Sequence, residues 1–315
     1  MARKRQPTID LRGYHRANRA GMMLLVMTLC QLLVPTVFSA VLELFGADLS
    51  SPSWGMPSAG YLLLYLLLYV LTMGIPLLLN RRLLMPKMRR LSPLNLLLDR
   101  RLCVVLCGVA LCLIANMVAA LLNGALFHAS SPVSSATVLG DGSVPTLLLD
   151  LLVFALAPAV LEETLLRGMV LQTLRPLGDK LAVVVSAVLF ALMHGNLRQA
   201  LYTLLMVLVL GFVFVYTDNL RLTVAVHALA NGLSVFATFL LQFTDTDFAT
   251  FWELVILVVA LMLGGVSTLW LWRHPLERSR PPLPTSAVAR FRAMIKAPLL
   301  WAAVTVMIIR IIALL

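Results

Sequence analysis

Residues 144–168 read VPTLLLDLLVFALAPAVLEETLLRG, an apolar run that ends in a cluster of charged residues. Its first part, 144–160, is apolar enough for a helix that crosses a bilayer, and Glu162, Glu163 and Arg167 fall inside the expected length of that helix. A charged side chain at the centre of a membrane costs roughly 2.5–3.5 kcal/mol on insertion scales. Three such residues together therefore predict mutual pairing beside a water-filled cavity.

Helical spacing separates the two carboxylates. Glu163 and Arg167 lie four residues apart on one face, with the acid before the base, and are predicted to neutralise each other. Glu162 points about 100° away from Glu163 and has no opposite charge on its own helix. A buried carboxylate without a neighbouring cation is suited to act as a general base near neutral pH. Glu162 is thus the predicted chemical residue, with Glu163–Arg167 as its structural support.

Composition places the chain in a membrane. Hydrophobic residues make up 61% of the 315, charged residues 12%, and the mean hydropathy is +0.95. A soluble domain of this size has too little interior for so much apolar surface. The net charge of +11 does not indicate nucleic acid, because the basic residues lie in short segments between apolar stretches. That distribution follows the positive-inside rule, so the predicted partner is the lipid bilayer and not nucleic acid.

The apolar stretches predict an all-α, polytopic transmembrane helical bundle of about eight to nine membrane helices. The predicted segments are 20–45, 59–79, 102–127, 144–173, 181–194, 197–216, 222–243, 248–272 and 298–315. Residues 181–194 are fewer than the roughly 20 that a full crossing needs, so this segment is left open. The predicted organisation is a basic arm (1–19), N-terminal membrane helices (20–143), core helices (144–243) and C-terminal membrane helices (244–315).

Charge alternation orients the predicted helices. With a cytoplasmic N-terminus, the outside segments hold one basic residue, Arg198. The first apolar run is long and lacks a small-residue cleavage pattern, which indicates a retained span and not a signal peptide. The four cysteines, all within apolar segments, are interpreted as small core residues and not as disulfides or a metal cluster: Cys30, Cys103, Cys107 and Cys112.

Further polar residues fall in apolar surroundings near the acidic stretch. His194 ends a short apolar segment, whereas His227 and Asn231 lie four residues apart on one helix face. Histidine transfers protons near neutral pH, and an Asn side chain can hold a developing oxyanion. A single intramembrane His or Asn more often joins helices, and Asn116 and Asp150 are assigned that packing role alone. Several such residues together favour a site, provided that the short segment lies obliquely so that they converge.

These residues also match a family pattern. Glu-Glu-x-x-x-Arg, Phe-x-x-x-His and His-x-x-x-Asn follow in this order over about 147–243. The combination resembles the CPBP (CAAX-processing and bacteriocin-processing, or Abi) intramembrane proteases, and is similar to CAAX prenyl endopeptidases of the type 2 class. The resemblance implies that Glu162, assisted by His194, activates water, and that His227 and Asn231 form an oxyanion hole. Glu163 and Arg167 fill the remaining motif positions.

The resemblance further implies a prokaryotic plasma-membrane endopeptidase that cuts peptide or protein substrates in or on the membrane. Prenylated CAAX proteins are the archetypal substrates of the family, and peptide pheromones, bacteriocin precursors and membrane proteins are alternatives. Other classes stay open at this point. One is a non-catalytic membrane interaction or bacteriocin-immunity protein of the same fold. Another is a transporter, which needs a polar path to both faces, and the outer halves of these helices hold few polar residues.

The metal requirement has two readings. Glu162, His194 and His227 can in principle hold Zn²⁺ with water in the fourth position. Against zinc, the sequence has no His-Glu-x-x-His pair, and His227 is spaced with Asn231 as an oxyanion site would be. The family resemblance also favours a glutamate-dependent mechanism without metal, so no cofactor is expected and zinc remains the alternative.

Overall fold

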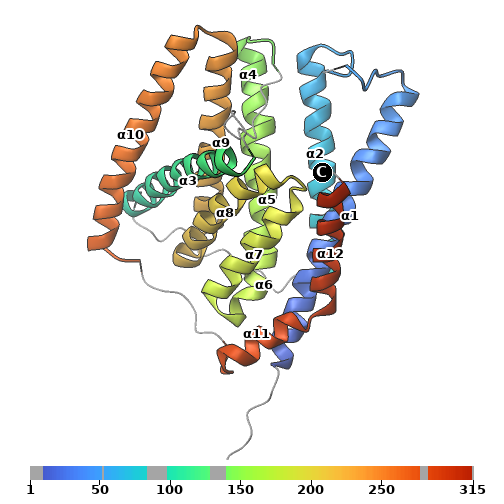
Figure 1. Cartoon of the computed structure of the whole chain (residues 1–315), viewed down its shortest axis with the longest axis vertical. Helices are drawn as coiled ribbons and strands as arrows, with labels where there is room; N and C mark the ends of the chain where they lie inside the picture. Colours follow the sequence, from blue (N-terminus) through green and yellow to red (C-terminus); the bar gives the residue numbers. More distant parts are fainter. Residues whose placement is uncertain (1–9, 52, 84–97, 128–139, 277–282, 314–315) are drawn as a thin grey trace, which may run out of the picture.

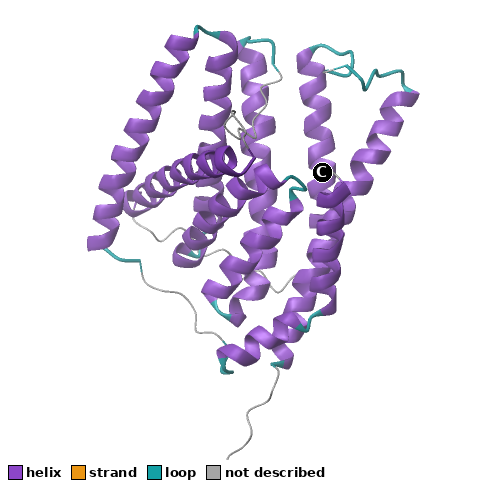
Figure 2. Cartoon of the chain, in the orientation of Figure 1, coloured by secondary structure: helices purple, strands orange, loops and turns teal. Residues whose placement is uncertain are grey.

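The computed structural model describes residues 10–51, 53–83, 98–127, 140–276 and 283–313. Throughout these ranges the regular structure is helical, without strands (Figure 2). The predicted arm before Asp10 lies outside the described residues. So do parts of the basic segments between 80 and 101 and between 273 and 296, and of the loop between 128 and 143.

The element order agrees closely with the predicted segments. The helices outside the acidic stretch are α1 (Leu11–Leu44), α2 (Ser58–Leu83), α3 (Leu98–Phe127), α7 (Asp179–Met193), α8 (Leu197–Thr217), α9 (Leu220–Phe243), α10 (Thr246–Arg273), α11 (Ala287–Ile295) and α12 (Pro298–Ala313). In Figure 1, α1, α2 and α12 stand on one side of the molecule and α10 on the other, with α3 crossing obliquely between them.

Seven of the described helices are long and apolar enough to cross a membrane. The pair α11 and α12, bent by 57°, brings the number to eight if it is counted as one span. The all-α polytopic bundle is therefore confirmed, with about eight helices that can span the membrane, and the chain is a membrane protein. The remaining predicted segment, 181–194, corresponds to α7, whose 15 residues rise only about 22 Å, against about 30 Å for a hydrocarbon core.

α1 begins earlier than predicted, because residues 11–19 of the proposed arm are helical. Oδ1 of Asp10 accepts hydrogen bonds from the backbone N–H groups of Arg12 and Gly13, at 3.0 and 3.1 Å, and so caps the helix. Gly21 of α1 then lies directly against α12, where a Cβ would come 2.3 Å from the backbone nitrogen of Leu300. In the turns before Gly21, Gly13 and Ala17 are buried, whereas Leu11 and Arg12 are exposed.

The predicted fourth span is one long, irregular helix, 144–177. Its parts are α4 (Val144–Leu151), the π-helical turn η1 (Leu152–Leu156), α5 (Ala157–Leu165), the π-helical turn η2 (Leu166–Leu171), α6 (Gln172–Leu174) and the 3₁₀ turn η3 (Arg175–Leu177). Each π turn inserts an extra residue and so rotates the face that follows it, and such turns occur frequently at functional sites. The two carboxylates lie on α5, between the two π turns.

Pro158 accounts for one backbone irregularity beside η1. Proline has no N–H, so the carbonyl four residues earlier, at Phe154, loses its helical hydrogen bond. The side-chain amide of Asn231 on α9 donates to that carbonyl at 3.2 Å. The side chain of the motif residue Asn231 therefore supplies the hydrogen bond that Pro158 cannot donate to the Phe154 carbonyl.

Candidate active site

A polar cavity of about 140 Å³ lies between α2, α5, α7, α8 and α9. Its lining includes the four residues predicted to act chemically: Glu162, His194, His227 and Asn231. These residues therefore converge, as the sequence analysis expected if the short segment 181–194 lies obliquely. A larger cavity of about 510 Å³, between α3, α8 and α10, is almost wholly apolar and contains none of the motif residues.

α7 delivers His194 to this cavity because the helix stops within the bundle. His194 is its C-terminal cap, and Gly195 follows with φ +71°, a left-handed conformation that glycine adopts without strain. Asn196 then caps α8 by accepting from the backbone N–H of Arg198 at 2.9 Å. A helix that crossed completely would carry His194 away from Glu162, so the shortness of α7 places this ring in the cavity.

The predicted pair of Glu163 and Arg167 forms a buried ion pair. Nη1 of Arg167 lies 2.7 Å from Oε1 of Glu163, and the two side chains are 1% and 0% exposed. Nη2 of Arg167 also donates to the backbone carbonyl of Val207 on α8 at 3.1 Å. Both charges are compensated, and Arg167 links η2 to α8.

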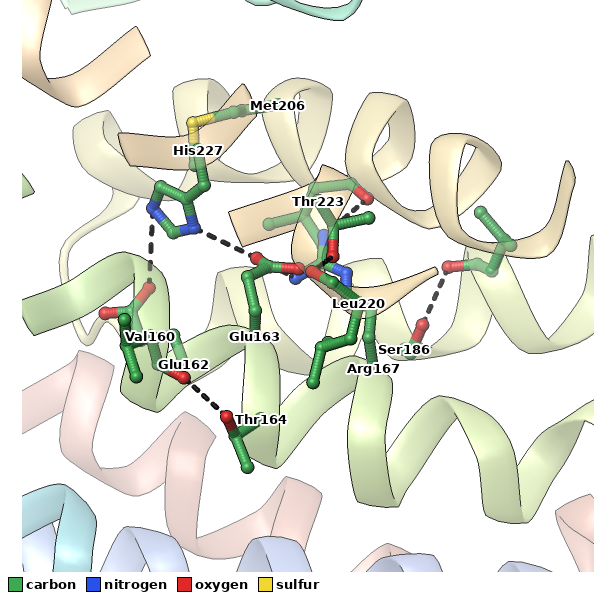
Figure 3. Close-up of polar contacts among 12 residues, drawn as sticks. Val160, Glu162, Glu163, Thr164, Arg167, Ser186, Met206, Leu220, Thr223 and His227 are labelled. Atoms are coloured by element: carbon green, nitrogen blue, oxygen red, sulfur yellow. Dashed lines mark hydrogen bonds and ion pairs between the residues drawn. The ribbon is translucent and has the colours of Figure 1, made fainter. Parts of the chain in front are cut away.

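The support extends further than the sequence indicated, because Glu163 also holds His227. Nδ1 of His227 donates to Oε1 of Glu163 at 2.9 Å (Figure 3). A carboxylate can only accept, so this bond fixes the proton on Nδ1 and aims Nε2 at the cavity. Nε2 lies 3.9 Å from Oε2 of Glu162, too far for a direct hydrogen bond. The hydrogen bonds thus link Arg167, Glu163 and His227 into one network. The network ends beside Glu162.

Glu162 has a second neighbour that sequence analysis missed. The hydroxyl of Tyr69 on α2 donates to Oε1 of Glu162 at 2.6 Å. One carboxylate oxygen is therefore held by the phenol, while the other faces His227. The available signal was the spacing of Tyr61, Tyr65 and Tyr69, which places three hydroxyls along one face of α2. That spacing does not predict that one of these hydroxyls bonds Glu162.

His194 is oriented by its own helix. Its Nδ1 lies 3.0 Å from the backbone carbonyl of Phe190, and because a carbonyl can only accept, this nitrogen carries the proton. The imidazole packs edge-on against the Phe190 ring, with 4.7 Å between ring centroids. The Phe-x-x-x-His motif therefore fixes the orientation of the His194 ring through local contacts. Nε2 is left as the ring nitrogen without the proton.

Asn231 keeps hydrogen-bonding capacity beyond its backbone contact. Its amide nitrogen carries two hydrogens, and the carbonyl of Phe154 takes one. The second hydrogen remains for a group in the cavity that Asn231 lines.

The three side chains named as alternative zinc ligands, Glu162, His194 and His227, all line the cavity. In the described ranges, no group of three or more His, Cys, Asp or Glu side chains is arranged so that it could hold a metal ion. Nδ1 of His227 is directed to Glu163, and Nδ1 of His194 to a backbone carbonyl. These contacts leave Nε2 as the other ring nitrogen of each histidine, as in histidines that bind zinc, so the expectation of no cofactor stays a prediction.

Together, the helical membrane fold and the buried Glu–His cavity are those of a candidate intramembrane hydrolase. Residues 144–233 match the family model of the type II CAAX prenyl endopeptidases, Rce1-like. This match confirms the resemblance to the CPBP and CAAX protease family, and the matched segment contains all three motifs. Curated proteins and solved structures give no significant match over any part of the chain. The family match thus supports a protease of the CAAX endopeptidase kind.

Proposed function

We propose that this protein is a glutamate-dependent intramembrane endopeptidase that hydrolyses a peptide bond near the C-terminus of a membrane-associated substrate. Prenylated CAAX-type proteins are the first substrate class to test. The observation that carries the proposal is the convergence of Glu162, His194, His227 and Asn231 on one polar cavity inside an apolar bundle. Polar and ionisable side chains at membrane depth are energetically costly, and where they occur they usually mark a functional site.

The first step is the activation of water. Tyr69 holds Oε1 of Glu162, which leaves Oε2 to accept a proton from a water molecule in the cavity. Nε2 of His194, unprotonated because Nδ1 carries the proton, accepts the second hydrogen bond of that water. The water oxygen attacks the scissile carbonyl carbon, and its proton moves to Glu162. The proton then passes to the departing amine nitrogen as the C–N bond breaks.

The second requirement is stabilisation of the oxyanion. Asn231 offers its remaining N–H. Nδ1–H of His227 is committed to Glu163, so Nε2 can donate to the oxyanion only when the ring is an imidazolium. Oriented donors of this kind are worth roughly 10²–10³ in kcat each. Glu163 and Arg167 act indirectly, by fixing the orientation of His227.

The mechanism uses no cofactor, and no step in it passes through a metal. The proposed location is a prokaryotic plasma membrane, with the N-terminus in the cytoplasm. This orientation follows from the positive-inside distribution.

The proposed activity is tested with the full chain in liposomes, using matched peptides with and without a C-terminal prenyl group. The product masses identify the bond that is cut, and a parallel sample contains a strong chelator. Cleavage of the prenylated peptide alone, unchanged by the chelator, is the expected result. Chelator-sensitive cleavage would overturn the metal-free mechanism. Absence of cleavage in the whole panel would favour the non-catalytic interaction or immunity protein.

A further inference from the structure

The C-terminal helix reaches the candidate site through one cation. Nη1 of Arg310 on α12 donates to the backbone carbonyl of Met193 at 3.0 Å and to Oε1 of Gln31 on α1 at 2.9 Å. Arg310 lies far outside the family match, which ends at residue 233. In Figure 1, α12 runs beside α1. α12 also contacts α7, and the bond to the Met193 carbonyl places Arg310 at the C-terminal end of that helix.

The carbonyl that Arg310 binds belongs to the peptide unit that joins Met193 to His194. At the end of α7, the N–H groups of His194 and Gly195 donate to the carbonyls of Ala191 and Leu192, at 3.2 Å each. The Met193 carbonyl lies beyond these bonds and accepts from Arg310. The last carbonyls of a helix have no partner within it and carry a partial negative charge. A guanidinium is therefore a favourable partner at this position.

The apolar surroundings give this contact further weight. Arg310 sits in PLLWAAVTVMIIRIIA, as the one charged residue of α12. A cation in such a segment is costly and needs a partner that compensates it. Among the described residues, both hydrogen-bond partners of Arg310 are neutral, and one of them is the peptide group of a motif residue.

We propose that Arg310 is a positioning residue for His194. By holding the Met193–His194 peptide, it fixes the terminal turn of α7, and with it the direction of the imidazole clamped to Phe190. The C-terminal helix thereby completes the site from outside the motif-bearing segment. This inference rests on the proposed function for its kinetic consequences. The effect on His194 itself does not depend on activity.

A purely structural role would be different, because Arg310 also binds Gln31 and could serve only to attach α12 to α1. The variants separate the two contacts. Arg310→Met removes both contacts with a side chain of similar length. Arg310→Lys retains a cation that can reach the carbonyl. Gln31→Leu removes the α1 contact and leaves the Met193 contact in place.

Initial rates in liposomes provide the first readout. Arg310→Met is expected to lower kcat roughly tenfold to a hundredfold, the scale of a misplaced catalytic group, with KM within about twofold. Arg310→Lys is expected to recover most of kcat, and Gln31→Leu to resemble the unmodified protein. An unchanged kcat in Arg310→Met would overturn the proposal. So would equal losses of kcat and melting temperature in Arg310→Met and Gln31→Leu.

The second readout is independent of hydrolysis. Protein labelled with ¹⁵N-histidine reports the tautomer of each of its five histidines by NMR, and His194→Gln assigns the His194 signals. A single Nδ1–H signal is expected for His194 in the unmodified protein, and a shifted or broadened one in Arg310→Met but not in Gln31→Leu. An unaltered signal in Arg310→Met would overturn the proposal. If no peptide is cleaved while the signal responds as expected, the proposed function fails and the positioning role stands.

Discussion

Glu163 and His227 meet at 2.9 Å across 64 residues of sequence, and this single contact joins two motifs into one site. The carboxylate that accepts from His227 also accepts from Arg167 at 2.7 Å, and both its cationic neighbour and the imidazole are buried. Glu163 is therefore a structural centre of the site. Glu162, one residue earlier, faces the cavity. Adjacent carboxylates thus receive different tasks from helical geometry.

Glu163→Ala is predicted to destabilise the fold, because it leaves Arg167 buried without its partner. Removing one member of a buried ion pair costs about 3–5 kcal/mol. Thermal unfolding in detergent measures this loss, with Glu162→Gln as the control from the same helix turn. Glu162→Gln is expected to unfold near the unmodified temperature, so equal melting temperatures for Glu163→Ala and Glu162→Gln would contradict the assignment.

Tyr69→Phe is predicted to reduce kcat while leaving the fold intact. The change removes the hydroxyl that holds Oε1 of Glu162 and keeps the packed ring. A hydrogen bond to a charged group contributes about 1.5–3 kcal/mol, which corresponds to roughly tenfold or more in rate if it orients the base. Tyr65→Phe is the matched control, since Tyr65 lines the same cavity one turn away. Equal effects of the two substitutions would argue against a specific role for Tyr69.

Asn231→Ala is predicted to lower both stability and activity, for separable reasons. It strands the Phe154 carbonyl that Pro158 leaves without a helical partner, a loss of about 1–3 kcal/mol. Adding Pro158→Ala supplies a backbone N–H at residue 158 and is expected to restore the melting temperature without restoring cleavage. A double variant that regains activity along with stability would remove Asn231 from the oxyanion site.

The start of the motif-bearing helix is predicted to weaken in acid. Hydrogen bonds from Ser143 and Thr146 lower the pKa of Asp141 to about 2, from an ordinary value near 3.8. Because the pKa is lowered in the folded state, the stabilisation is full above about pH 4 and is lost as the pH falls towards 2. Asp141→Asn should unfold at a lower temperature than the unmodified protein at pH 6, and the difference should shrink between pH 4 and 2. A difference independent of pH would contradict this assignment.

Much of the fold follows from the sequence, because hydrophobic length and basic-loop alternation are local properties. The pairing of Glu163 with Arg167 was predictable for the same reason, since both lie on one helix. The contact of Tyr69 with Glu162 was not predictable, because it depends on how α2 packs against α5. The same holds for Asn231, whose partner is a backbone carbonyl that Pro158 frees 77 residues away in sequence.

The extent of each helix was predicted less well where capping and packing decide it. α1 begins at Leu11 because Asp10 caps it, and the positive charges of the arm gave no sign of that boundary. The two π turns around α5 likewise have no simple sequence signature, although Pro158 marks the first of them. Whether the chain divides at residues 19, 143 and 243, as the sequence indicated, remains a prediction.

The most direct measurement is the cleavage rate of the full chain in liposomes for the unmodified protein, Glu162→Gln and Thr164→Val. Thr164 is the matched control, because it lies on the same turn of α5 and its hydroxyl donates to the local carbonyl of Val160 at 2.6 Å. Glu162→Gln is expected to fold normally and to abolish cleavage, and Thr164→Val is expected to retain the full rate. Substantial cleavage by a folded Glu162→Gln protein would contradict the central claim that this carboxylate activates water.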